Sequence, residues 1–449
     1  MPELRPYQQE DVETLSKLQK AACFNEPRTG KTPTILKTIE KLNCKKVIIV
    51  CPASTMLQWK KEYETWLNKP CVVISGTPTQ KQKLVTQWKH GLIINYEALK
   101  TTKKGTGFVQ TLLNQNPDTI IVDEAHRIKN YKSANAMAIF AFSKLPYKFA
   151  LTGTPAPNAP EEVWSILHFL YPEQYKSYWK FIDEYFNKSQ ISLPGRPMFI
   201  QIKGFQSKTK AYELQLKIDA IATNRKRKDV MPWLPKKDVT NVFLEPTKAQ
   251  TKYLEELHKF YETEHIITQG VLDRLIRYRQ ICLDPGILEL KGTSPKTEWL
   301  KQFIKDYPDK PILIFSKFTT YLQKLTKELK LTNNLIIGET PIKTRQARID
   351  AFQNGKINQL LINIDAGNTG LTLDRAEAII FTDKYPPVGD IEQAEDRFIA
   401  TTKEKSNEAH TIYNLILKDT YDQQIYEMIK QKKSMIDIIN DYKKYLTKE

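Results

Sequence analysis

Four β-branched residues run directly into two carboxylates in the stretch Thr119-Ile120-Ile121-Val122-Asp123-Glu124-Ala125-His126. Such a run is typical of a strand that is buried on both faces of a parallel sheet. The two acids would then lie at the carboxyl end of the strand, where open α/β sheets bind their ligands. Adjacent acids at that edge suit a magnesium-nucleotide site, in which one orients the water shell of the metal and the other polarises an attacking water. The alternative interpretation is a strand that ends in a solvated acidic turn.

A phosphate-binding loop is predicted upstream of these acids. Its sequence is Asn25-Glu26-Pro27-Arg28-Thr29-Gly30-Lys31-Thr32. An apolar strand precedes it and a helical pattern follows it, which is the setting that a Gly-Lys-Thr loop requires. Gly30 would let the backbone approach phosphate oxygens, Lys31 would contact the β and γ phosphates, and Thr32 would ligate Mg²⁺. Asn25 replaces the first glycine of the usual pattern.

Further apolar runs with polar exits predict two α/β lobes with parallel sheets. In the N-terminal lobe, the predicted strands are residues 21–24, 46–51, 91–97, 119–126 and 149–155. In the C-terminal lobe, they are residues 311–315, 334–337, 359–363, 378–381 and 411–416. Helical patterns alternate with these strands, as they do in parallel α/β folds. We therefore expect a first lobe over residues 1–165, a helical insertion with the inter-lobe linker over 166–290, and a second lobe over 291–449.

The composition favours a globular protein with a polyanionic partner. Apolar residues make up 41% of the chain, and 68 Lys+Arg against 51 Asp+Glu give a net charge of +17. That charge favours nucleic acid as the partner, whereas the alternative is a lysine-rich surface that reflects composition bias alone. No apolar run approaches the roughly 18 residues of a membrane span. Scattered cysteines without CxxC spacing indicate a reduced, cytoplasmic setting and no structural metal.

The intermediate segment, residues 166–290, combines helical patterns with aromatic and basic residues. Aromatic side chains crowd residues 171–186, where they would form either a stacking surface for nucleic acid or the core of a helical insertion. Their helical spacing favours the core. A basic run at residues 224–228 is either a solvated face or a phosphate contact, and the net charge favours the phosphate contact.

Motif-like segments follow one another along nearly the whole chain. They are Leu4-Arg5-Pro6-Tyr7-Gln8, Glu26 to Thr32, Cys51 to Ser54 with Gln58-Trp59, Asn95 to Glu97, Asp123 to His126, Leu151 to Pro155, Arg225 to Val230, Leu234 to Lys237, Arg279 to Cys282, Ile314 to Lys317, Thr340 with Arg345, Gly367 to Leu371, and Gln393 to Arg397. In content and order they resemble the motifs of the Snf/Swi (sucrose-nonfermenting) family of superfamily-two DEAH-box helicases and translocases.

This resemblance implies two RecA-like lobes in tandem with a helical insertion, and ATP and Mg²⁺ as cofactors. The implied catalytic residues are Lys31, Asp123, Glu124 and Arg397. The implied nucleotide contacts are Gln8, Arg28, Thr29, Gly30, Lys31, Thr32, Asp123, Gly370 and Arg397, with Thr32 and Asp123 as the metal ligands. We expect His126 to couple the acidic motif to the Leu151–Pro155 motif by a hydrogen bond rather than to act as a base.

The resemblance also implies that the strand exits of both lobes grip a DNA backbone, through short hydroxyl, amide and N–H donors rather than base readers. The implied DNA contacts are Ser54, Gln58, Asn95, Tyr96, Thr152, Gly153, Ser316, Lys317, Thr340, Arg345 and Thr369. Opening and closing of the lobes would step the protein along DNA.

The chain departs from the family pattern at two positions. Arg28 stands where the family usually has glycine, and Ala400 replaces the second arginine of the last motif. Arg397 is then the one arginine-finger candidate in that motif, with Arg375 as a candidate substitute. No bromodomain-like, zinc or histone-binding module is recognised, so the chain resembles the compact members of tailed bacteriophages and of fork-remodelling repair enzymes.

We therefore expect a monomeric ATP-driven DNA motor in the cytoplasm, or in the host cytoplasm if the chain is of phage origin. It would remodel branched DNA by fork regression, branch migration or short-duplex unwinding, in replication, recombination or repair. One alternative is a duplex translocase that displaces bound proteins without separating strands. The other is a non-enzymatic DNA-binding scaffold with a degenerate ATPase, for which Asn25 and Ala400 are the only support.

Overall fold

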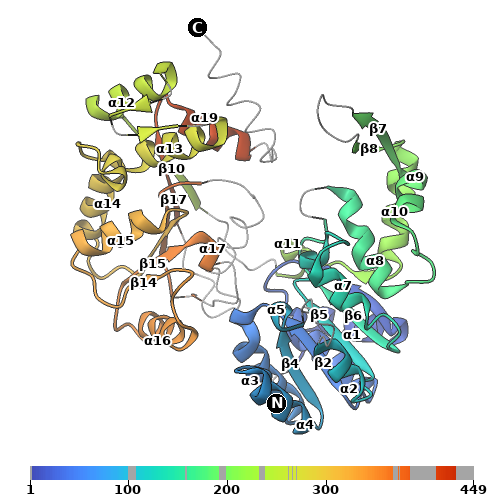
Figure 1. Cartoon of the computed structure of the whole chain (residues 1–449). Coiled ribbons are helices and arrows are strands. Elements are labelled where there is room, and N and C mark those ends of the chain that lie inside the picture. Colours follow the sequence, from blue (N-terminus) through green and yellow to red (C-terminus); the bar gives the residue numbers. More distant parts are fainter. Residues whose placement is uncertain are drawn as a thin grey trace. The chain divides into compact units, whose positions relative to one another are not determined.

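The computed structural model describes residues 3–99, 108–156, 159–191, 199–231, 238–260, 262–264, 266–268, 270–367, 373, 375–384 and 411–430 (Figure 1). The chain divides into two compact units, Met1–Pro232 and Trp233–Glu449. The boundary falls within the predicted intermediate segment, residues 166–290, which contributes to both units.

The first unit is built on a seven-stranded sheet in the order β3-β4-β2-β5-β6-β1-β9, and every described pairing in it is parallel. Its strands are β1 (Lys20–Cys23), β2 (Val47–Cys51), β3 (Cys71–Val73), β4 (Gly91–Asn95), β5 (Thr119–Asp123), β6 (Tyr147–Leu151) and β9 (Ala222–Thr223). Five of them are the predicted strands. Strands β3 and β9 are too short to show a period in the sequence, which is why they were not predicted.

Helices cover both faces of this sheet, and therefore its central strands are apolar throughout. In β2, Val47 and Ile49 pack on one face while Ile48 and Val50 pack on the other. One face is covered by α1 (Pro6–Leu18), α2 (Lys31–Lys41) and α3 (Met56–Leu67). The other is covered by α4 (Pro78–Thr86), α5 (Tyr96–Leu99), α6 (Phe108–Leu113), α7 (Ala134–Phe140) and α8 (Trp164–Leu170). Each fully buried valine or isoleucine contributes about 1.5–3 kcal/mol.

The aromatic cluster of the intermediate segment forms a core of its own. Its elements are α9 (Tyr178–Tyr185), α10 (Lys208–Asp219) and an antiparallel ribbon of β7 (Phe186–Ile191) and β8 (Phe199–Phe205), and the short helix α11 (Arg227–Val230) lies outside this core. Phe181, Tyr185 and Phe186 are at most 3% exposed and pack together with Trp164 of α8. The core interpretation of these aromatics is confirmed, although Trp179 remains 41% exposed.

The second unit has a six-stranded parallel sheet in the order β10-β17-β16-β13-β15-β14. Its strands are β10 (Asp238–Leu244), β13 (Ile312–Ser316), β14 (Leu335–Ile336), β15 (Gln359–Asn363), β16 (Ala378–Phe381) and β17 (Thr411–Leu417). Strand β10 was not predicted, and it lies within the segment that was expected to be helical. The reason is that β10 is an edge strand whose side chains are mostly exposed, so it lacks an apolar run.

Helices also cover both faces of the second sheet. One face is covered by α12 (Lys248–Phe260), α13 (Val271–Leu283), α16 (Ile342–Gln353) and α19 (Tyr421–Lys430), and the other by α14 (Pro295–Asp306) and α15 (Thr319–Glu328). The short elements are β11 (Glu262–Thr263), β12 (Ile266–Ile267) and α17 (Ile364–Gly367). The two parallel sheets confirm the predicted α/β class with two lobes. Among the described residues, no helix has the length and apolar character to cross a bilayer.

Candidate functional site

The predicted phosphate-binding loop connects β1 to α2 at the carboxyl edge of the first sheet. Gly30 ends the loop with a φ of +81°, and a side chain there would place its Cβ 2.0 Å from Nε2 of Gln8. The ammonium of Lys31 donates to the carbonyl oxygens of Asn25 (2.9 Å) and Glu26 (3.3 Å). The cation therefore lies over the loop, next to the N-terminus of α2, where a phosphate would be bound.

Helix α1 holds the end of this loop. The side-chain amide of Gln8 and the hydroxyl of Tyr7 both donate to the carbonyl oxygen of Thr29, at 3.0 and 2.8 Å. The amide oxygen of Gln8 accepts from the backbone N–H of Arg5 at 2.8 Å. Gln8 thus shapes the loop directly, and its expected contact with adenine stays a prediction.

Asn25, the residue in place of the usual glycine, is completely buried and holds the start of the loop. Its Nδ2 donates to Oδ2 of Asp11 at 2.7 Å, and its Oδ1 accepts from the backbone N–H of Arg225 at 2.9 Å. The guanidinium of Arg225 in turn donates from Nε to Asp11 (2.8 Å) and from Nη2 to Glu10 (2.9 Å). Carboxylates therefore bind the Arg225 side chain in this structure, and the phosphate contact predicted for the basic run stays a prediction.

Asp123 lies at the end of β5, as predicted. Its Oδ2 accepts from the indole Nε1 of Trp59 at 2.8 Å, and its Oδ1 accepts from the backbone N–H of Glu124 at 3.0 Å. Burial, and after it the nearby Glu124 carboxylate, raise the pKa of the Asp123 carboxyl to about 6. Trp59 was not predicted as a site residue, because a tryptophan on a helix gives no sign of the strand end that it contacts.

Glu124 adopts a left-handed backbone conformation, with φ +50° and ψ +50°. This conformation costs a residue with a side chain about 1–3 kcal/mol and persists where its surroundings hold it. The hydroxyl of Tyr96 supplies such a hold, since it donates to the carbonyl oxygens of Asp123 (2.5 Å) and Glu124 (3.4 Å). The Glu124 carboxylate lies 3.3 Å from Nδ1 of His126.

His126 joins the exits of β5 and β6, as expected from the sequence. Its Nδ1 lies 3.1 Å from the hydroxyl oxygen of Thr152, which also accepts from the backbone N–H of Thr154 at 3.1 Å. Gly153 packs so tightly that a Cβ there would lie 2.9 Å from Cδ of Pro27 in the phosphate-binding loop. The loop, the acids and the β6 exit therefore lie against one another, although they come from three separate parts of the chain.

The donors present at this edge fit a magnesium nucleotide. Thr32, half-buried at the start of α2, offers a hydroxyl, and Asp123 offers a carboxylate. Mg²⁺ prefers oxygen ligands and is usually held by one or two protein groups together with phosphates and water. Arg28 and Thr29 complete the loop, with Arg28 in a left-handed conformation and the Thr29 hydroxyl donating to the carbonyl oxygen of Glu26 at 2.8 Å.

The side chains predicted to contact DNA in the first unit differ in accessibility. Gln58 is exposed, while Ser54 and Asn95 are half-buried at strand exits. Tyr96 and Thr152 are completely buried, and their side chains are engaged with the acidic motif. The last two therefore position other groups in this structure, and the DNA contacts of all five stay predictions.

The predicted residues of the second unit lie at the carboxyl edge of its sheet. The Ser316 hydroxyl donates to Asp383, which also accepts from the backbone N–H of Lys317 at 3.2 Å. The hydroxyl oxygen of Thr340 accepts from the backbone N–H of Ile337 at 2.9 Å, and Nη2 of Arg345 lies 3.4 Å from the Ile337 carbonyl oxygen. Four other positions lie outside the described residues, namely Thr369, Gly370, Arg397 and Ala400.

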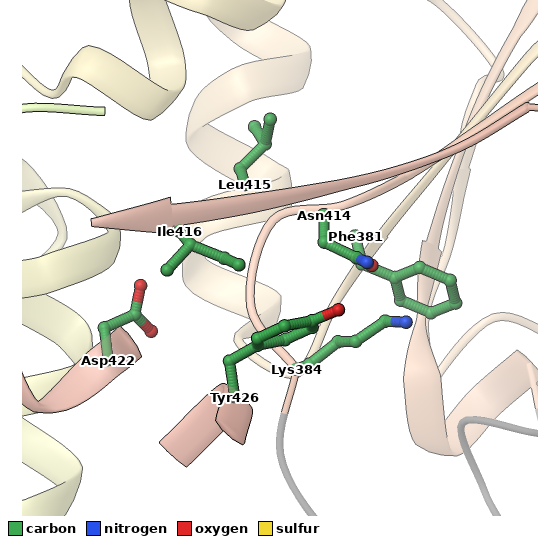
Figure 2. Close-up of a pocket in the computed structure, with 7 residues that line it drawn as sticks. All are labelled: Phe381, Lys384, Asn414, Leu415, Ile416, Asp422 and Tyr426. Atoms are coloured by element: carbon green, nitrogen blue, oxygen red, sulfur yellow. The ribbon is translucent and has the colours of Figure 1, made fainter. Parts of the chain in front are cut away.

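A pocket of about 400 Å³ follows the ends of β10 and β17, and Glu245, His258, Tyr278 and Lys418 are among its lining residues. A second pocket at this edge is too small for a nucleotide. Its volume is about 10 Å³, which is close to the smallest space that admits one water. Figure 2 shows the lining residues Phe381, Lys384, Asn414, Leu415, Ile416, Asp422 and Tyr426. The Lys384 ammonium lies 4.6 Å from the centre of the Phe381 ring.

Arg375, the candidate substitute for a second arginine finger, is a structural residue of the second unit. Its Nη1 donates to the carbonyl oxygens of Phe352 (2.9 Å) and Ile357 (3.0 Å), and its Nη2 donates to Oδ1 of Asn358 at 2.7 Å. These bonds tie the end of α16 to the turn before β15. A guanidinium with three protein acceptors is unsuited to a finger role.

Two protein families match this chain. Residues 7–287 match the SNF2-related domain, and residues 295–399 match the helicase conserved C-terminal domain. The chain is 25% identical, over 96% of its length, to an uncharacterized ATP-dependent helicase of Mycoplasma pneumoniae. It is 24% identical, over 95% of its length, to human chromodomain-helicase-DNA-binding protein 8. The chain spans 42% of the first relative and 18% of the second.

A solved structure of similar organisation is the Sulfolobus solfataricus SWI2/SNF2 ATPase core in complex with dsDNA. The identity is 22% and the TM-score is 0.44, with 96% of this chain and 91% of that chain covered. The family follows from the domain match, which takes in more than half of the present chain. This protein belongs to the SNF2-related family and carries the core of an ATP-dependent helicase or translocase.

Proposed function

We propose that this chain is a DNA-stimulated ATPase that remodels branched DNA by fork regression, branch migration or short-duplex unwinding, in replication, recombination or repair. The observation that carries the ATPase is the meeting of three segments at one sheet edge. Strand β6 lies between β1 and β5 in the sheet, so the phosphate-binding loop, Thr152 and the acids are neighbours. The bond between His126 and Thr152 and the contact between Gly153 and Pro27 support this arrangement.

Each residue of this edge has a distinct part in hydrolysis. Lys31 and the N–H groups at the start of α2 would bind the phosphates. Thr32 and Asp123 would hold Mg²⁺, which neutralises phosphate charge when it is bound. Glu124 would polarise the attacking water, with His126 3.3 Å away to orient its carboxylate. Arg397 is proposed as the arginine finger that stabilises charge on the γ-phosphoryl group.

DNA is the proposed partner because of charge and of the chemistry at the strand exits. The net charge of +17 suits a polyanion, and the human relative is named a DNA-binding helicase. Gln58, Asn95 and Lys317 offer amide and ammonium donors suited to backbone phosphates. The other predicted contacts are Ser54, Tyr96, Thr152, Gly153, Ser316, Thr340, Arg345 and Thr369. Those that are buried would act by holding neighbouring backbone donors in place.

ATP hydrolysis by the full chain, with and without DNA, tests the proposal. We expect DNA to stimulate hydrolysis and Lys31→Ala to abolish it, because the ammonium that contacts the phosphates is lost. Lys41→Ala, on the exposed end of the same helix, is the matched control and should retain activity. Hydrolysis that DNA does not stimulate, or that survives Lys31→Ala, would contradict the proposal.

The DNA substrate is tested by strand release from single strands, duplexes, forks and four-way junctions. Branched-DNA remodelling predicts ATP-dependent release of strands from forks and junctions. A motor that displaces a blocking protein from duplex DNA yet releases no strand would instead be a duplex translocase. A chain that binds DNA without ATP turnover would be a scaffold.

A further inference from the structure

The segment before the unit boundary is paired with the phosphate-binding loop. Strand β1 pairs with β9 in parallel, and the same ladder continues beyond β1 into the loop. The donors are the backbone N–H groups of Ala22, Phe24 and Glu26, and the acceptors are the carbonyl oxygens of Ile221, Thr223 and Arg225, at 2.8–3.0 Å. The Glu26 carboxylate returns the contact, since it accepts from the backbone N–H of Arg227 at 2.7 Å.

Side chains reinforce this pairing. Asn25 bonds through its two amide atoms to Asp11 and to the backbone of Arg225, and the Arg225 guanidinium bonds to Asp11. The three residues therefore form a closed triangle in which each contacts the other two. They come from α1, the loop and the segment 222–230, which are far apart in the sequence.

Burial makes the Asp11 carboxylate depend on Arg225 for its compensating charge. Asp11 and Asn25 are completely buried, and burial raises the pKa of the Asp11 carboxyl while the bonds from Asn25 and Arg225 oppose that rise. Arg225 is the cation that compensates a buried carboxylate, and its removal would leave that charge unpaired. The second carboxylate partner, Glu10, has a side chain that is 67% exposed, and exposed pairs contribute little.

Helix α1 connects the Asp11–Asn25–Arg225 triangle to the other end of the loop. Asp11 lies one turn after Gln8 on α1, and Gln8 and Tyr7 both bond to the carbonyl oxygen of Thr29. The start of the loop is thus held through Asp11, and its end through Gln8. Arg225 does not lie among the phosphate-binding groups, but it bonds to Asp11 on the helix that contacts both ends of the loop.

We propose that Arg225 is a positioning residue of the phosphate-binding loop, and that the segment 222–230 thereby sets the nucleotide affinity of the first unit. The inference rests on the proposed ATP site. The first unit ends at Pro232, so the segment that holds the loop is also the one through which the chain passes to the second unit. Asn25, which stands at the first glycine of the usual phosphate-loop pattern, makes this connection through its side chain.

Nucleotide binding and hydrolysis by the full chain test the inference. A fluorescent ATP analogue with Mg²⁺ measures the Kd, and steady-state hydrolysis with DNA measures KM and kcat separately. We expect Arg225→Ala and Asn25→Ala each to raise the Kd and the KM for ATP about tenfold, without a change in kcat at saturating ATP. The double variant should bind ATP no more weakly than the weaker-binding single variant, because both changes break the same triangle.

Three further variants separate positioning from a general loss of structure. Arg225→Lys keeps the charge but loses the two-pronged geometry, so it should restore part of the affinity. Glu10→Ala and Lys226→Ala change exposed neighbours and should bind nucleotide as the unaltered chain does. If Arg225→Ala fails to fold in a thermal unfolding assay, Asn25→Ala decides alone, because it leaves the Asp11–Arg225 pair intact.

Two results would overturn the inference. One is an unchanged nucleotide Kd in Asn25→Ala, and the other is a double variant whose losses are the sum of the single ones. If the unaltered chain binds and hydrolyses ATP, and Asn25→Ala has the same Kd and KM for ATP, only this inference is wrong. If the unaltered chain binds no nucleotide, the proposed function is wrong as well.

Discussion

The carboxyl edges of the two sheets each carry an aspartate, half-buried at Asp123 and buried at Asp383, and the neighbours of these aspartates differ. Asp123 in the first unit accepts hydrogen bonds from neutral groups, the Trp59 indole and a backbone N–H. Asp383 in the second unit faces the guanidinium of Arg279 at 3.3 Å and also accepts from the Ser316 hydroxyl. A buried carboxylate that already has a cation is part of the structure, whereas one with neutral donors can receive a cation from outside.

Two buried lysines repeat this contrast. Lys148 in the first unit is completely buried and donates to backbone carbonyl oxygens, one of them that of Phe169 at 2.9 Å. Lys296 in the second unit is equally buried, but its ammonium lies 2.7 Å from the Asp422 carboxylate. Lys148 therefore keeps a charge of the kind that Asp422 neutralises at Lys296, and a buried charge without an opposite partner costs free energy.

The largest effect is expected at the acid assigned to the water. Glu124→Gln should lower kcat for ATP hydrolysis about 10²- to 10⁴-fold, because an amide cannot accept the proton of the attacking water. Nucleotide binding should be retained, since the phosphate-binding loop is unchanged. Hydrolysis and binding of an ATP analogue measure the two effects. Glu64→Gln, which changes an exposed acid on α3, is the control. Unchanged turnover in Glu124→Gln would show that Glu124 does not act in the mechanism.

The contrast between the two aspartates predicts opposite effects on stability. Asp383→Asn should destabilise the second unit by about 3–5 kcal/mol, because Arg279 would be left buried without its carboxylate. Asp123→Asn should leave the first unit as stable or more stable, because an amide oxygen can still accept from Trp59 and a buried charge is removed. Hydrogen exchange of strands β5 and β13 during urea unfolding measures the two units separately. Equal losses in the two variants would contradict the contrast.

Lys148 predicts a pH dependence of stability in the first unit. Burial lowers the pKa of Lys148 from 10.5 to about 8. The unfolded chain then binds more protons than the folded chain between these values, so the free energy of unfolding rises with pH across that interval, by at most about 3 kcal/mol. The free energy of unfolding of the unaltered chain, minus that of Lys148→Met, should therefore rise from pH 8 to 10.5. A pH-independent difference in thermal or urea unfolding would show that the ammonium is not desolvated.

The smallest effect is expected at Lys317, whose ammonium pairs with Asp365 at the edge of the second sheet. Both side chains are partly exposed, so Lys317→Ala should change stability by less than about 1 kcal/mol. If Lys317 contacts a DNA phosphate, the same variant should lower the slope of log affinity against log salt by about 1. Lys305→Ala, exposed on α14, should leave the slope unchanged. An unchanged slope in Lys317→Ala would remove this DNA contact.

Much of the fold was predictable because it depends on neighbours in the sequence. Ten of the parallel strands, among them β5 and β13, were predicted from apolar runs, since a strand that is buried on both faces is apolar at every position. Strand β10 has no such run, because it lies at an edge, and its place in the sheet depends on pairing with β17. The positions of Gly30, Lys31 and the acids were likewise predictable, because the chemistry of phosphate and metal binding requires fixed residue types at fixed spacing.

Residues 119–126 alone predict a buried strand that ends in two acids, and the order of the motifs alone indicates the family. The fold determines which polar groups surround these acids. Trp59 binds Asp123 from 64 residues away, and Arg225 reaches Asn25 across 200 residues. No local pattern records such partners, because hydrophobic periodicity reports only which face of an element is buried. The free energy of a buried charge depends instead on which groups the fold places around it.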